Sequence, residues 1–311
     1  MENTLIKKEN QNIKGLSTFV LKIIAILSMT LDHIGYVLQN IYPIASLEII
    51  AYIFRNIGRL ALPIFIFCLL EGLTHTKNIK KYLLRLGIEA LLIYLAITLI
   101  QIVMKESFNF GYAGNIFLTL FILALFYYFI YYSKYKFLAF IPILYIVLSL
   151  GTKLLFVEGF YTIREIKSFI YFNGLFLQYD VIGPVLFIGT LLGYKIYDYK
   201  INKNLCVENK ETIETFKTSK EYQRSKNTII CVIIAFLSLL CYLITYLPFY
   251  NNGIDQLVDG ALQSSMFFSV IFLFFYNGRK GYSNKAIQYA FYLYYPLHII
   301  LIYLVFYFIF K

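Results

Sequence analysis

The chain has 311 residues, of which 60% are hydrophobic and only 14% are charged, with a formal net charge of +11. This composition excludes an ordinary soluble domain, because too few polar side chains remain to cover its surface. The positive mean hydropathy instead indicates an all-α, polytopic integral membrane helix bundle.

Apolar stretches long enough to cross a bilayer recur along the whole chain. At about 20 apolar residues per helix, the sequence predicts about nine spans, at residues 17–39, 47–73, 82–104, 115–132, 137–156, 179–198, 227–248, 261–277 and 287–309. The first stretch contains Lys22 and Asp32 and is too long for a signal peptide. We therefore expect it to remain as the first span.

Lys and Arg residues alternate between successive predicted loops. Most of the 28 basic residues fall in the segments that a cytoplasmic N-terminus would place in the cytoplasm. Within a single domain covering residues 1–311, we interpret residues 200–226 as a cytoplasmic polar loop. Residues 160–170 have apolar residues at helical spacing, which predicts either an interfacial helix or a partly ordered loop.

Ionisable side chains interrupt the first two spans, and such groups mark a candidate functional site because they are costly in a bilayer. Lys22 and His33 are close to three helical turns apart and so share one face. Asp32 points about 100° away from His33, so its partner is expected on another helix. An antiparallel hairpin would bring Asp32 to Arg55 or Arg59, as a catalytic pair or as a structural ion pair.

Further ionisable groups follow at the ends of the predicted spans. Glu71 and His75 lie one turn apart at the predicted cytoplasmic end of the second span, although His75 could simply interact with the helix dipole. Basic residues follow directly, and they would form a rim suited to phosphate groups: Lys77, Lys81 and Arg85. In the last span, Pro296 and His298 suggest an internal cavity, or a histidine that only packs.

Several motifs resemble the TraX family. The motifs are dense over residues 20–86, thinner near Asn115 and Gln178, and present again at 292–303. They include Met29-x-x-Asp32-His33-x-Gly35, Gly58-Arg59-Leu60-Ala61-x-Pro63, Glu71-Gly72-x-x-His75 and Tyr294-Tyr295-Pro296-Leu297-His298. TraX proteins are associated with acetylation of the N-terminal residue of pilin. The family is similar to the wider group of transmembrane acyltransferases, in which an Arg often stands where this chain has Lys22.

The resemblance implies a multi-pass enzyme of the bacterial inner or plasma membrane. It would carry an acyl group, expected to be acetyl, from cytoplasmic acyl-CoA to an amine or hydroxyl of an acceptor outside. An intramembrane histidine can accept the proton of that amine or hydroxyl, and fixed cations can stabilise the oxyanion. Neither a metal nor a nucleic acid is expected to take part.

We assign three sets of residues to this reaction. The catalytic set is His33, Asp32, Arg59, His75 and Glu71. The set for acyl-CoA is Lys22, Arg55, Lys77, Lys81 and Arg85. The set for the acceptor is Asn115, Gln178, Tyr295 and His298. Which of His33, His75 and His298 is the base stays open.

Two other classes of protein also fit the intramembrane charges. A proton-coupled secondary transporter could use the same residues to relay protons, although the sequence shows no internal repeat. A nonenzymatic assembly factor for secretion or conjugation is the second alternative. The expected partners are membrane lipids and either a pilin-like peptide or a surface glycan, and the oligomeric state is left open.

Overall fold

The computed structural model describes residues 15–104, 115–157, 175–179, 181–204, 216–217, 219–247 and 260–310. Most of these residues are helical, and the β-type pairing among them is limited to two isolated bridges, Leu16 with Tyr276 and Asn115 with Leu177. The predicted all-α class is confirmed.

Helices lie in each of the predicted spans. They are α2 (Thr18–Tyr36), α3 (Glu48–Gly58), α4 (Ala61–His75), α5 (Ile79–Met104), α6 (Ile116–Tyr131), α7 (Phe140–Val157), α8 (Ile182–Asn204), α10 (Lys220–Ile244), α12 (Gly260–Ser264), α13 (Ser269–Phe274) and α14 (Lys285–Ile309). Within the described residues, five segments are long and apolar enough to cross a membrane, namely Thr18–Ile41, Ala45–His75, Ile79–Leu99, Lys220–Ile244 and Lys285–Ile309. The count of nine spans and the cytoplasmic N-terminus stay predictions.

The second predicted span is divided into two helices. α3 ends at Gly58 and α4 begins at Ala61, so Arg59 lies in a turn inside the apolar segment. Pro63 lies in the first turn of α4, where a missing N–H costs little. The backbone N–H of Arg59 donates to the Asn56 carbonyl at 3.2 Å, so the break leaves this group paired.

The predicted polar loop at 200–226 is shorter than expected. α8 continues to Asn204, and α10 begins at Lys220 after Ser219, whose hydroxyl accepts the Tyr222 N–H at 3.1 Å as an N-cap. Both ends of the loop are therefore helical. Residues 205–215 lie outside the described residues, as does the interfacial segment predicted at 160–170.

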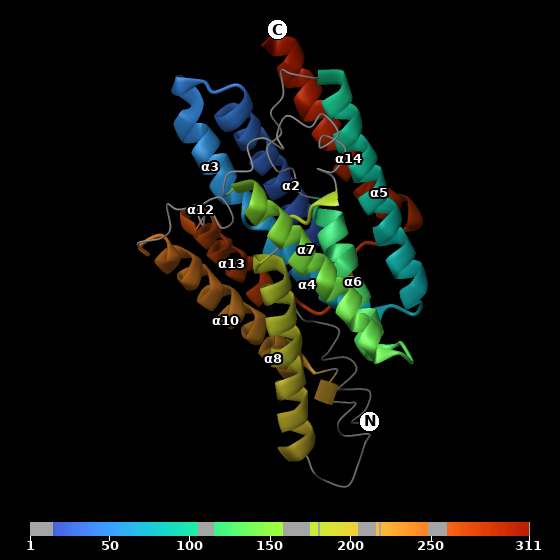
Figure 1. Ribbon diagram of the computed structural model, residues 1–311. Coiled ribbons are helices and arrows are strands. Elements are labelled where there is room, and N and C mark those ends of the chain that lie inside the picture. Colours follow the sequence, from blue (N-terminus) through green and yellow to red (C-terminus); the bar gives the residue numbers. More distant parts are fainter. Residues whose placement is uncertain are drawn as a thin grey trace.

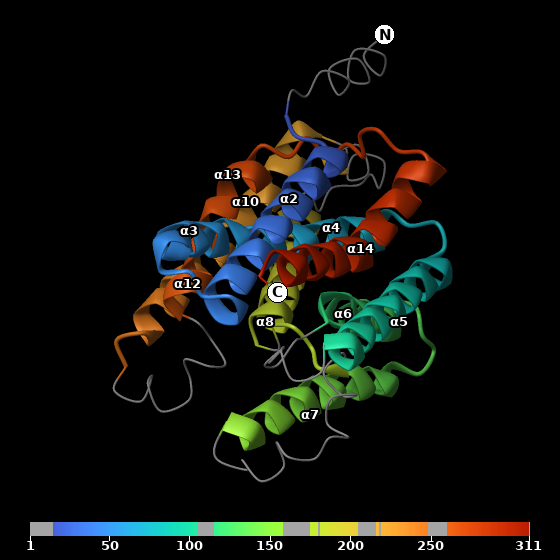
Figure 2. The same cartoon turned by 90° about the horizontal axis from the view of Figure 1, so that it is seen from above.

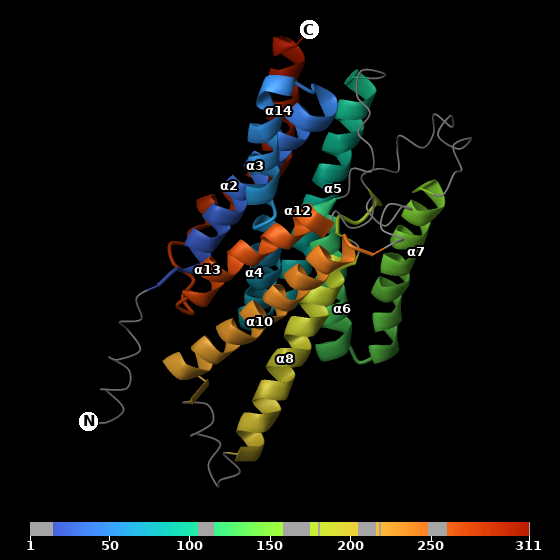
Figure 3. The ribbon, with the colours of Figure 1, turned by 90° about the vertical axis from the view of Figure 1, so that its left-hand side faces the viewer.

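α2 lies at the centre of the bundle. It packs against α3, α4 and α14, and Figure 2 shows it between α3 and α14. On one side α10 packs with α8, α12 and α13, and on the other α5 packs with α6 and α14 (Figure 1). α7 packs on α6 at the edge of the bundle (Figure 3). The central helix is therefore the one that bears Asp32 and His33.

Several predicted cytoplasmic segments gather at one end of the bundle, which we call the basic end. The Thr18 N–H donates to the Arg279 carbonyl at 2.9 Å, and Lys195 Nζ lies 4.8 Å from the centroid of the Tyr131 ring. The start of α2, the end of α6, the far part of α8 and the segment before α14 thus share this end. The grouping agrees with the predicted alternation of loops, and the side of the membrane stays a prediction.

Candidate functional site

The centre of the bundle holds the buried ion pair that the sequence predicts. Asp32 of α2 is buried, and its Oδ1 lies 2.7 Å from Arg55 Nη1 of α3. Arg59 donates to the same oxygen from Nη2 at 2.9 Å. Two cations against one carboxylate leave this cluster with a net positive charge, which suits a site where negative charge develops.

Glycines let α2 and α3 approach closely enough for this pairing. A Cβ on Gly58 would collide with the side chain of Asp32, and a Cβ on Gly35 would lie 2.7 Å from the Ala51 carbonyl oxygen. The glycines in the motifs around Asp32 and Arg59 therefore have a packing role. They bring the carboxylate of one helix within reach of the guanidinium groups of the next.

Arg59 also joins distant parts of the chain. Its Nη1 donates to the Tyr179 hydroxyl at 3.0 Å and lies 3.5 Å from Gln263 Oε1 of α12. The sequence does not predict these two partners, because Tyr179 and Gln263 are ordinary residues near predicted span ends.

Two histidines face each other near this cluster. His33 of α2 and His298 of α14 have ring centroids 5.2 Å apart, with their planes inclined by 58°. The His298 ring also stacks on Tyr294 at 5.0 Å and meets the edge of Tyr295 at 5.2 Å. His33 directly follows Asp32 in α2, so the histidine pair lies beside the ion-paired cluster.

The hydrogen bonding of His298 assigns its tautomer. Its Nδ1 lies 3.0 Å from the Tyr294 carbonyl oxygen, which can only accept, so Nδ1 carries the hydrogen. Nε2 of the neutral ring then has a lone pair. This atom is buried and has no hydrogen-bond partner among the described residues. Of the three histidines, His298 is therefore the one with a buried, unoccupied basic nitrogen.

Lys22 lies on the same face of α2 as His33. Its Nζ is 5.8 Å from the centroid of the Phe291 ring, and His33 meets His298, so both side chains face α14. The predicted common face is confirmed. Eleven residues place the two about 16 Å apart along the helix.

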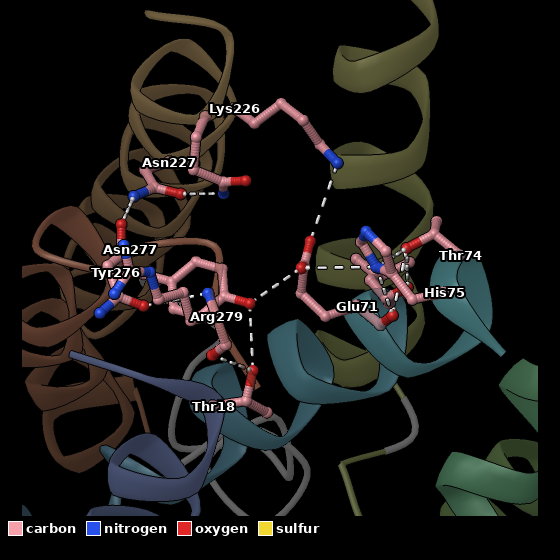
Figure 4. Close-up of polar contacts among 11 residues, drawn as sticks. Thr18, Glu71, Thr74, His75, Lys226, Asn227, Tyr276, Asn277 and Arg279 are labelled. Atoms are coloured by element: carbon pink, nitrogen blue, oxygen red, sulfur yellow. Dashed lines mark hydrogen bonds and ion pairs between the residues drawn. The ribbon is translucent and has the colours of Figure 1, made fainter. Parts of the chain in front are cut away.

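A second polar cluster surrounds Glu71 at the basic end (Figure 4). Glu71 is buried, accepts a 3.0 Å hydrogen bond from the Tyr276 hydroxyl and lies 3.7 Å from Lys226 Nζ. The side chain of His75 is 70% exposed, and its Nδ1 lies 3.7 Å from Glu71 Oε2. The predicted Glu71 and His75 pair is thus present, about 18 Å along α4 from Arg59.

The residues predicted to bind acyl-CoA lie in three places. Lys77 and Lys81 are exposed at the basic end, and Arg85 is half-buried and donates to the Lys81 carbonyl at 3.2 Å. Arg55 lies in the Asp32 cluster, and Lys22 lies against α14. The structure therefore brings only Lys77, Lys81 and Arg85 of this set together.

The residues predicted to bind the acceptor lie in two separate places. Asn115 is buried and caps α6, accepting a backbone N–H at 3.1 Å and donating to a carbonyl of α5 at 2.8 Å. The backbone N–H of Gln178 donates to the Thr119 hydroxyl, so Asn115 and Gln178 lie together at the start of α6, level with the middle of α5. Tyr295 and His298 lie within the bundle beside His33.

Sequence reasoning missed two buried charges. Glu89 lies in the predicted span at 82–104, where the rule that singles out Asp32 would have found it. Lys226 looks like one more topology-determining cation, but its Nζ lies 4.4 Å from the ring centroid of Tyr194 and pairs with Glu71. No local pattern reveals that pairing, because it depends on how α10 packs against α4 and α8.

A cavity of about 530 Å³ opens between α8 and α10 at the basic end. Its lining residues are Tyr197, Lys220, Glu221, Arg224, Ser225, Thr228 and Ile229. None of them belongs to the histidine pair or to the Glu71 cluster. The cavity adds two cations to an end of the molecule that is already basic.

The fold and the buried polar cluster define a helical membrane protein with an ionisable site inside the bundle. A model of the TraX family, described as "TraX protein", matches residues 17–168, and the predicted resemblance to that family is confirmed over this part of the chain. The matched part includes Asp32, Arg55, Arg59, Glu71 and Glu89.

One curated relative shares a shorter segment. The chain is 40% identical over 72 residues to "Probable fimbrial assembly protein FimC, serogroup H1" of Dichelobacter nodosus. That segment is 22% of this chain and 27% of the relative, so the chain spans about a quarter of the relative's length. No solved structure gives a significant match to the chain.

Proposed function

We propose that this protein is an integral membrane acyltransferase of the bacterial inner membrane, which moves an acyl group, acetyl in the simplest case, from cytoplasmic acyl-CoA to an amine or hydroxyl outside. The observation that carries the proposal is the facing pair of His33 and His298, 5.2 Å apart beside a buried, net-positive Asp32 cluster. A base and fixed cations in one dry site are what acyl transfer needs.

Each of these groups has its own role in the reaction. The acceptor nitrogen or oxygen attacks the carbonyl carbon of the thioester as His298 Nε2 takes its proton. The C–S bond then breaks, its electron pair stays on the sulfur, and the thiolate receives the proton. Arg59 and Arg55 supply positive charge for the carbonyl oxygen in the tetrahedral intermediate. His33 holds the facing imidazole ring in position.

Two observations support a pilin-like acceptor. The resemblance to the TraX family, whose model matches residues 17–168, implies acetylation of pilin, and the relative is described as a fimbrial assembly protein. We infer that the acceptor is the N-terminal amine of a pilin-like peptide, with a surface glycan as the rival. The basic end, with Lys77, Lys81 and Arg85, would receive the phosphates of CoA.

The test is a reconstituted assay. The purified protein in liposomes receives acetyl-labelled acetyl-CoA on one side, and a pilin-like peptide or a glycan on the other. We predict label on the peptide N-terminus and release of free CoA. Uptake of a labelled solute without acetylated product would favour a transporter, and peptide binding without either would favour an assembly factor.

A further inference from the structure

The cavity at the basic end lies where α8 and α10 separate. A Cβ on Gly193 of α8 would lie 2.6 Å from Ile229 Cγ2 of α10, so the two helices are in close contact at this level. One turn further along α8, Tyr197 lines the cavity, and Figure 3 shows the two helices diverging towards their basic ends. The volume of about 530 Å³ falls within the range of about 300–1,000 Å³ that is usual for small-molecule sites.

The cavity has a net positive charge. Its lining contains the cations Lys220 and Arg224, one turn apart on α10, and the carboxylate of Glu221, so one positive charge is left over. Lys220 and Arg224 are exposed, and neither has an ion-pair partner within the part of the chain that the structure describes. Lysine and arginine both bind phosphate groups. The lining therefore favours a phosphate-bearing ligand.

The same face of α10 becomes apolar beyond the cavity. Thr228, which lines the cavity, is followed at intervals of four residues by Val232 and Phe236, whose side chains are 61% and 63% exposed. On α8, Leu192 and Ile196 are also exposed, on either side of the contact at Gly193 in the sequence. α10 is long and apolar enough to cross a membrane, so we expect this apolar face to contact hydrocarbon.

We propose that this cavity binds the headgroup of an acidic phospholipid. Lys220 and Arg224 contact the phosphate group, and an acyl chain lies along Val232 and Phe236. Basic pockets between transmembrane helices are sites where acidic headgroups bind. A soluble phosphate ester could contact the two cations, but it would leave the apolar face of α10 uncovered. The lipid site does not depend on the proposed acyl transfer.

The first test uses the absence of Trp from the sequence. Val232→Trp places a fluorophore on the apolar face of α10, and Val147→Trp is the matched control on α7, where the native side chain is 58% exposed. Each variant is reconstituted in phosphatidylcholine with increasing amounts of phosphatidylglycerol that carries brominated acyl chains, which quench a Trp that they contact.

We expect phosphatidylglycerol to quench Val232→Trp at a mole fraction roughly 30-fold lower than Val147→Trp, the effect of two basic residues beside an acidic lipid. Lys220→Gln together with Arg224→Gln should remove this difference. Equal quenching of the two Trp variants would overturn the inference, because it would mean that the lipid only surrounds the protein.

A second measurement identifies the source of the phosphate group. Native mass spectrometry of the purified protein should show bound phosphatidylglycerol, which the Lys220→Gln and Arg224→Gln double variant binds roughly 30-fold more weakly. Lys134→Gln with Lys280→Gln removes two exposed cations at the basic end but outside the cavity, and should leave binding unchanged. Ser225→Trp, which fills the cavity without a change of charge, should abolish binding. Equal binding of phosphatidylcholine, or displacement of the lipid by acetyl-CoA, would overturn the proposal.

Discussion

Asp32 is the residue on which the central cluster depends. Its Oδ1 accepts from Arg55 and Arg59, and both guanidinium groups are largely withdrawn from solvent. Removal of one member of a buried ion pair leaves the other charges desolvated and unpaired, which costs more than the pair itself contributes. The free energy of unfolding should therefore respond strongly to changes at this position.

Replacement of Asp32 by Ala should lower the free energy of unfolding by about 3–5 kcal/mol, because two buried guanidinium groups lose their carboxylate. The measurement is reversible unfolding in mixed detergent micelles. Glu48→Ala, which removes an exposed carboxylate, should change the free energy of unfolding by about 0–1 kcal/mol. Equal effects of the two substitutions would mean that the Asp32 pairs do not stabilise the fold.

At the scale of residues, the sequence predicts pairs within a hairpin better than pairs across the bundle. Asp32 could be matched to Arg55 and Arg59 because two consecutive spans joined by a short loop must be antiparallel neighbours. The contact between His33 and His298 could not be matched, since nothing in either segment states that α14 packs beside α2. The same limit hid the pairing of Lys226 with Glu71.

At the scale of elements, close packing of α2 on α3 is the feature that assembles the cluster. Gly58 and Gly35 lie where the two helices approach, and a methyl group at either position would meet the facing helix. The interface therefore tolerates no added volume at these glycines. Gly151 of α7, by contrast, has no atom within 4 Å of an added Cβ.

Gly58→Ala should destabilise the protein by about 1–3 kcal/mol, because the new Cβ collides with Asp32 and pushes α3 away from α2. Gly151→Ala should be neutral or stabilise by up to about 1 kcal/mol, since Ala favours a helix over Gly. Thermal unfolding of both variants in the same detergent checks this. A Gly58→Ala protein as stable as the Gly151→Ala protein would show that the helices do not pack this closely.

The sequence predicts that these elements exist more reliably than where they end. In the apolar run at 47–73, Pro63 indicates a break near Arg59, because it has no N–H to donate to the Arg59 carbonyl. The side-chain partners of Arg59, Tyr179 and Gln263, lie far along the chain and have no such sign. The polar run at 200–226 looks like a loop by composition. Its ends are helical because Ser219 caps α10 and Tyr222 bonds Asp198 of α8 at 2.7 Å.

At the scale of the whole molecule, the two polar clusters lie at different depths. The Glu71 cluster lies at the basic end, and the histidine pair lies about 20 Å further in, as measured along α14. An acyl group delivered by a cytoplasmic donor must therefore cross much of the hydrocarbon layer to reach His298. This separation makes the orientation of the bundle part of the proposal.

Single cysteines test that orientation. In a background without the four native cysteines, Lys134→Cys and Lys280→Cys are exposed in segments at the basic end, and Ser46→Cys is exposed in the predicted outer loop. An impermeant thiol reagent should label Ser46→Cys in intact cells, and the other two only after the membrane is opened. The reverse pattern would place the basic end outside and contradict a cytoplasmic donor.

The most direct measurement is acetyl transfer from labelled acetyl-CoA to a pilin-like peptide by reconstituted wild type, His298→Gln, His33→Gln and His75→Gln. We predict that His298→Gln and His33→Gln lower kcat by roughly 100-fold or more, whereas His75→Gln, altered at the exposed basic end, chiefly raises KM for acetyl-CoA. Transfer at the wild-type rate by His298→Gln and His33→Gln would contradict the assignment of the facing histidines as the site of acyl transfer.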